Sequence, residues 1–108
     1  MVIIETKIFS RQINTLLGKE EYRMFQLYLL DNWESGERIK GSGGIRKIRW
    51  NKDHKGKSGG IRILYYVVID TDNVLLLLAY SKSEKDDLSA EQLKILKKIV
   101  REELDNGR

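Results

Sequence analysis

The apolar residues of the first third of the chain recur at helical spacing. Between positions 9 and 17 they stand at 9, 13, 16 and 17, which predicts a helix with Ser10 as a possible N-cap. A second helix is predicted to begin near Lys19, and Gly18 between the two indicates an antiparallel helix pair. The run Val2–Ile4 favours a strand only if it pairs with a distant part of the chain.

After Asn32 the helical spacing disappears, and strands separated by turn residues take its place. The segments 44–50, 61–69 and 74–80 read as strands, and the last two are apolar on both faces, as buried strands are. Residues 70–73 form a polar turn, so these two strands are predicted to make an antiparallel hairpin. Helical spacing returns at Ser89, which forms a capping box with Gln92 ahead of an apolar stripe: Leu93, Leu96, Val100 and Leu104.

The order of elements is therefore strand, two helices, three strands and a terminal helix. This order predicts an α+β fold in which an N-terminal helix pair and a C-terminal helix gather on one side of a small antiparallel sheet. At 108 residues the chain is expected to form one domain, residues 1–108, because two domains of half that length would each be too small to bury a core.

Composition excludes several classes of chemistry. The chain has no cysteine, which rules out disulfides, thiolate metal sites and cysteine nucleophiles. His54 is the only histidine, so a mechanism that needs two histidines, or a His-based metal site, is also excluded. The sequence near Met1 does not resemble a secretory signal, and the apolar run 74–79 is far shorter than the ~20 residues of a membrane span.

Positive charge is concentrated in the middle of the chain. Residues 36–62 hold nine of the 20 Lys and Arg residues but only two of the 16 acidic residues, although the net charge of the whole chain is only +4. Isoleucines and Trp50 are interleaved with the cations, which indicates that the cations are mounted on folded strands. Such a surface is typical of a nucleic-acid-binding protein, and Arg46, Lys47, Arg49 and Lys52 are its predicted contacts. Trp50 could stack on a base or belong to the core.

The start of the strand 61–69 is the first candidate site. Lys55 and Lys57 stand among glycines just before it, and Arg62 lies on the strand face opposite its isoleucine neighbours, where its guanidinium could bind a phosphate. A solvated turn with lysines for solubility is the alternative. The glycines lack the spacing of a nucleotide-binding P-loop. An imidazole side chain titrates near neutrality, which suits proton transfer, but a lone loop histidine such as His54 is often incidental.

Hairpin geometry brings a second set of residues to the same place. In an antiparallel pair the end of the strand 74–80 lies beside the start of the strand 61–69. Tyr80 and Lys82 are therefore predicted to approach Arg62 and the segment that holds Lys55 and Lys57.

Three segments resemble the RelE/HigB superfamily of bacterial toxins, and the HigB-type branch most of all. They are Gly43–Trp50 (GGIRKIRW), Lys55–Tyr66 (KGKSGGIRILYY) and Leu77–Leu88 (LLAYSKSEKDDL), in the order and spacing of the superfamily. The resemblance implies the toxin of a type II toxin–antitoxin pair with the α+β, RelE/ParE-like fold described above. It also implies a metal-independent endoribonuclease without a cofactor, which cuts mRNA on the ribosome.

The resemblance also implies roles and partners. Attack of a ribose 2′-hydroxyl on the adjacent phosphate would be assisted by Arg62, which holds the phosphate, and by Lys55 and Lys57, either of which could be the general base. Lys82 would lie in the same cleft, and Tyr80 and His54 are the remaining candidates for proton transfer. The expected partners are a HigA-like antitoxin with a helix-turn-helix, the ribosome and mRNA; no membrane is expected, and the expected location is the cytoplasm.

Two other functions share this architecture. One is a ParE-like toxin that inhibits DNA gyrase without cutting RNA, although ParE relatives generally lack the concentrated cations. The other is an RNA-binding domain without catalytic activity.

Overall fold

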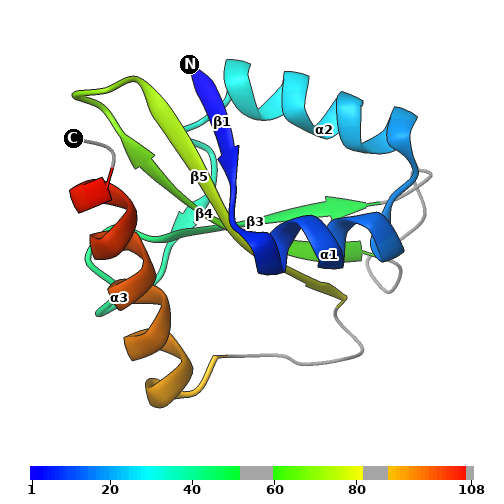
Figure 1. Ribbon diagram of the computed structural model, residues 1–108. Helices are drawn as coiled ribbons and strands as arrows, with labels where there is room; N and C mark the ends of the chain where they lie inside the picture. Colours follow the sequence, from blue (N-terminus) through cyan, green and yellow to red (C-terminus); the bar gives the residue numbers. More distant parts are fainter. Residues whose placement is uncertain (52–59, 82–87, 107–108) are drawn as a thin grey trace.

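The computed structural model describes residues 1–51, 60–81 and 88–106 (Figure 1). Its elements follow the predicted order, with one added short strand. They are β1 (Val2–Glu5), α1 (Lys7–Leu16), α2 (Lys19–Asp31), β2 (Glu37–Arg38), β3 (Arg46–Asn51), β4 (Gly60–Val68), β5 (Asn73–Ser81) and α3 (Ala90–Asn106).

The strands form one five-stranded sheet in the order β1-β5-β4-β3-β2. β4 is the middle strand, and it pairs antiparallel with both β3 and β5, as its apolar character predicted. The predicted α+β fold is confirmed, and the other strand pairs are antiparallel, but the sheet is mixed because β1 adds to the edge of β5 in parallel. The short strand predicted at the start of the chain therefore does find a distant partner.

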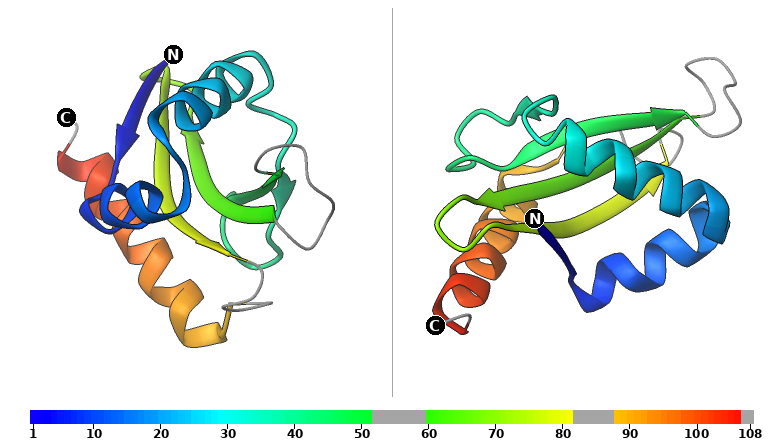
Figure 2. Two further views of the ribbon diagram at one scale, coloured as in Figure 1. Left: turned by 90° about the vertical axis from the view of Figure 1, so that its right-hand side faces the viewer. Right: turned by 90° about the horizontal axis from the view of Figure 1, so that it is seen from above.

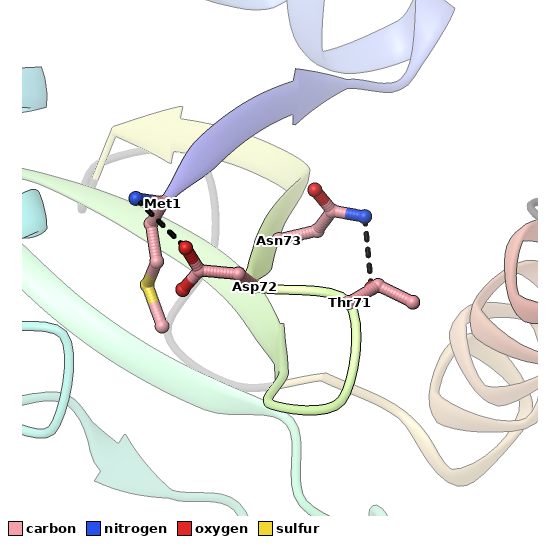
Figure 3. Close-up of polar contacts among 4 residues, drawn as sticks. All are labelled: Met1, Thr71, Asp72 and Asn73. Atoms are coloured by element: carbon pink, nitrogen blue, oxygen red, sulfur yellow. Dashed lines mark hydrogen bonds and ion pairs between the residues drawn. The ribbon is translucent and has the colours of Figure 1, made fainter.

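Contacts with the turn between β4 and β5 fix the start of β1. The backbone N–H of Val2 donates to the carbonyl of Asp72, and the Met1 ammonium lies 3.3 Å from the Asp72 carboxylate (Figure 3). Asp72 has a positive φ of 58°, a conformation that Asp tolerates better than most residues, and the side chain of Asn73 donates to the Thr71 hydroxyl. The predicted polar turn is thus also the anchor of the N-terminus.

The two faces of the sheet are covered by different helices (Figures 1 and 2). Phe9 of α1 and Phe25 of α2 are fully buried against one face, and Leu96 and Val100 of α3 are buried against the other. The prediction that all helices gather on one side is therefore wrong. Because β4 and β5 are apolar on both faces, each face must be shielded from water, and α3 shields the second.

Two local predictions have different outcomes. The capping box is confirmed: the N–H of Ser89 donates to Gln92 Oε1 at 2.9 Å, and the N–H of Gln92 donates to Ser89 Oγ at 3.1 Å. The N-cap of α1, in contrast, is Thr6 and not Ser10, so the helix begins earlier than predicted. Thr6 Oγ1 accepts from the N–H of Phe9 and donates to the carbonyl of Leu77, which ties the cap to β5.

Candidate anion-binding site

Three polar side chains form a row across the middle of the sheet. In the register of the strands, Arg62 of β4 pairs with Arg49 of β3 on one side and with Tyr80 of β5 on the other. Directly paired residues project from the same face, so the three side chains are neighbours. The predicted approach of Tyr80 to Arg62 is confirmed by this register.

Alternation along β4 decides which face carries the row. Ile61 and Ile63 belong to the core under α1 and α2, so Arg62 between them projects from the opposite face. Leu64, two residues after Arg62 in β4, lies on the same face and belongs with Tyr80 to the core under α3. Arg62 therefore stands where the apolar α3 face of the sheet gives way to a polar region.

Arg62 is buried without a hydrogen-bonding partner. Its side chain is 7% exposed, and its Nη1 atom is fully shielded from solvent. Within the described parts of the chain, Nη1 has no hydrogen-bond acceptor. A buried unpaired donor costs on the order of 1–3 kcal/mol of folding free energy, and more when it is charged. A group that carries this cost in the free protein is suited to pair with an anionic ligand.

The charges around Arg62 increase this tendency. Arg49, directly opposite Arg62, is exposed. Lys47 lies on the same face, two residues before Arg49 in β3. The ion pair that the structure records within the described ranges joins Met1 to Asp72, so neither arginine has a carboxylate partner there. Like charges directly opposite each other destabilise a sheet, whereas an anion between the two guanidinium groups would turn the repulsion into two charge-assisted hydrogen bonds.

Arg46, also predicted to bind nucleic acid, is not brought to this row. It lies on the other face of β3, where its Nη1 donates to the carbonyls of Glu34 at 3.0 Å and Gly36 at 2.9 Å. The buried Tyr65 hydroxyl donates to the carbonyl of Trp33 and accepts from the N–H of Gly36. Burial raises the pKa of Tyr65 above its usual range. Arg46 and Tyr65 together hold the segment 33–36 against the sheet.

Trp50 lies on the face of the sheet that α1 and α2 cover and packs against the core there, as the core alternative predicted. Its ring packs edge-on against Phe25 at a centroid distance of 5.4 Å, and its Nε1 donates to Glu21 at 3.3 Å.

The remaining predicted site residues lie outside the described residues. They are Lys52, His54, Lys55 and Lys57, between β3 and β4, and Lys82, after β5.

Asn51 was not among the predicted site residues. Asn51 is the last residue of β3, pairs with Gly60, and shares the face of Lys47 and Arg49. The alternation Lys47, Arg49, Asn51 was the available signal, since every second residue of a strand faces the same way.

The described residues hold neither a metal-ligand cluster nor a membrane-spanning helix. They contain no group of three or more His, Cys, Asp or Glu side chains placed to hold a metal ion. No helix within the described ranges is long and apolar enough to cross a membrane.

The chain matches a known protein family and is similar to solved structures. Residues 30–106 match the sequence model of the family described as the RelE toxin of the RelE/RelB toxin–antitoxin system. The fold is similar to that of a double mutant of the E. coli toxin RelE in the free state, with a TM-score of 0.58. The two share 16% sequence identity over 79% of this chain and 86% of that chain.

Proposed function

The chain belongs to the RelE family of toxins, which act as ribosome-dependent mRNA endoribonucleases, and we propose that it grips the RNA phosphate with Arg62. The observation that carries this proposal is the buried guanidinium whose Nη1 has no partner, with a second arginine directly opposite. In a chain of this family, the anion that suits two adjacent guanidinium groups is the phosphodiester of the message.

The proposed reaction needs positive charge where negative charge develops. The 2′-oxygen forms a bond to phosphorus, the bond from phosphorus to the 5′-oxygen breaks, and a 2′,3′-cyclic phosphate remains. Charge accumulates on the non-bridging oxygens in the transition state, and Arg62 and Arg49 lie in a row suited to receive them. Because its neighbours Ile61 and Ile63 are buried in the core, the backbone of Arg62 is already fixed when the charge appears.

We assign the residues that transfer protons from their positions in the sequence and from the register of β4 and β5. The base that takes the 2′-hydroxyl proton is proposed to be Lys55 or Lys57, as the resemblance implies, with Lys82 and His54 in supporting roles. Tyr80 is the phenol next to Arg62 in register, and we assign to it the proton that the departing 5′-oxygen needs.

Lys47 and Arg49 extend the positive surface away from Arg62 along β3, and Lys52 follows them in sequence. We propose that Lys47 and Lys52 bind phosphates flanking the cut and, together with Arg49 at the phosphate that is cut, position the message without reading its sequence.

The sequence alone supports a more specific proposal for the type of antitoxin that binds this chain. RelE-family toxins are neutralised by antitoxins. The three segments that resemble the HigB-type branch support a HigA-like antitoxin with a helix-turn-helix as the partner of this chain.

Brief expression of the protein in bacteria, followed by pulse labelling, tests the proposed function. We expect incorporation of labelled methionine to stop within minutes, while labelled thymidine incorporation continues. Early loss of thymidine incorporation with signs of DNA damage would instead support a gyrase inhibitor. An RNA-binding domain without catalytic activity would leave full-length transcripts in cells in which translation had slowed.

A further inference from the structure

Three side chains converge above Gly60, next to the unpaired nitrogen of Arg62. A Cβ atom placed on Gly60 would stand 3.6 Å from Arg62 Nη1, 3.5 Å from Arg49 Cγ and 2.5 Å from Asn51 Oδ1. Two guanidinium side chains and one carboxamide therefore surround the same point. A Cβ at position 60 would collide with the Asn51 carboxamide, so the glycine is what allows Asn51 Oδ1 to lie over the backbone beside the arginines.

Asn51 differs from the arginines in its exposure and its chemistry. Asn51 is exposed at the end of β3 and pairs with Gly60. Arg62, two residues after Gly60 in β4, is buried. Among the described residues, no hydrogen bond joins the Asn51 carboxamide to a partner, and a carboxamide carries both donors and an acceptor. A phosphate that moves in toward Arg62 would leave its nucleotide at the level of Asn51.

We propose that Asn51 is a specificity-determining residue, whose carboxamide hydrogen-bonds to the base adjacent to the phosphate held by Arg62. This inference rests on the proposed function. A carboxamide can donate and accept side by side, which matches the paired donor and acceptor on the edge of a base and discriminates among bases. Arg49, Arg62 and Lys47 carry only donors, so they bind phosphates of any sequence alike.

The alternative is that Asn51 does no more than end β3. In that case its side chain would be replaceable without any effect on the choice of cleavage site. The two roles therefore predict different results for conservative substitutions.

The proximity of Asn51 to Arg62 suggests one informative variant. In Asn51→Asp a carboxylate takes the place of the carboxamide beside Nη1 and supplies the guanidinium with an internal anion. This ion pair would compete with the RNA phosphate. It would also satisfy the unpaired donor, so activity and stability are expected to change in opposite directions.

The experiment compares wild type, Asn51→Asp, Asn51→Ser and the control Asn14→Asp. Asn14 is an exposed residue of α1, and the substitution changes the net charge equally. For each purified protein, the cleavage rate and the 5′ ends of the products are measured on ribosome-bound message, and the thermal midpoint is measured in phosphate-free buffer.

Four results are expected. Asn51→Asp cuts about 10²-fold more slowly than wild type, and its thermal midpoint is higher by about 4 °C or more. Asn51→Ser still cuts but distributes its cuts differently among the wild-type sites. Asn14→Asp matches wild type in rate and in sites.

Cutting by Asn51→Ser at the wild-type sites in wild-type proportions would overturn the inference, whatever the aspartate variant does. A lower midpoint for Asn51→Asp would overturn the proximity to Arg62 on which the inference rests. If wild type itself makes no cuts, the proposed function fails, and the midpoint of Asn51→Asp still tests the geometry independently.

Discussion

Replacing Arg62 by methionine should make the protein more stable and less active. Methionine fills about the same length of apolar space as the arginine stem, without the guanidinium. The structure gives the Arg62 side chain no hydrogen bond or ion pair with a described residue, so the substitution removes no favourable polar contact within that part of the chain. It does remove one unpaired buried donor and one like-charge neighbour of Arg49.

These two changes set the magnitude. Relief of the buried unpaired donor contributes about 1–3 kcal/mol, and relief of the cross-strand repulsion about 0.2–1 kcal/mol. We therefore expect the free energy of unfolding to rise by roughly 1–4 kcal/mol. At this chain length each kcal/mol raises the thermal midpoint by about 4 °C or more. Cleavage of ribosome-bound message should fall by about 10²–10³, the usual cost of losing one group that stabilises transition-state charge.

The assay is urea unfolding followed by circular dichroism, at low salt and without phosphate, which could occupy the site. The matched control is Arg23→Met on α2, which removes an exposed arginine and should change stability by less than about 0.5 kcal/mol. A loss of more than about 1 kcal/mol in Arg62→Met would contradict the reasoning. Such a loss would mean that the arginine stabilises the fold and does not wait for a ligand.

Four further results are expected. Tyr65→Phe loses the hydrogen bonds to Trp33 and Gly36 and should lower the free energy of unfolding by about 1–3 kcal/mol in urea titration, with cleavage sites unchanged. Gly36→Ala should be destabilised as well, because its new Cβ would collide with the Tyr65 hydroxyl; a thermal midpoint equal to that of wild type would refute this contact. RNA binding through about six phosphates should weaken by roughly 10³ between 50 and 200 mM salt, measured by filter retention of a labelled, non-cleavable oligonucleotide. The double variant Lys47→Ala, Arg49→Ala should reduce the slope of that salt dependence by about two; an unchanged slope would remove both side chains from the RNA-binding surface.

Features set by neighbouring residues could be predicted from the sequence. The capping box at Ser89 and Gln92 is an exchange of two hydrogen bonds within one helical turn, so its pattern is visible locally. The hairpin of β4 and β5 is also local, because two apolar strands joined by a short polar turn have one simple way to pair.

Features set by distant contacts could not be predicted. β1 pairs with β5, across most of the chain, and no local pattern marks a parallel partner. Thr6 caps α1 in preference to Ser10 because its hydroxyl also reaches the backbone of β5. The side on which α3 packs was mistaken for a related reason: the helix stripe shows which residues are buried but not against which face.

The candidate site was predictable in composition but not in geometry. Arg46 and Arg49 look equivalent in a run of cations, yet alternation along β3 sends Arg46 to the segment 33–36 and Arg49 to Arg62. That alternation was readable in the sequence. The unpaired nitrogen of Arg62 was not, because it depends on the register of three strands and on what each neighbour can reach.

Binding of the phosphate that is cut by the buried, unpaired guanidinium of Arg62 underlies all the predictions for cleavage. Its most direct test is to map the 5′ ends of a defined message in a reconstituted translation reaction, with wild type, Arg62→Met and Arg23→Met, each with and without ribosomes. New ends should arise only when ribosomes are present and only with wild type and Arg23→Met. A folded Arg62→Met protein that produces the same ends at the wild-type rate would contradict the account.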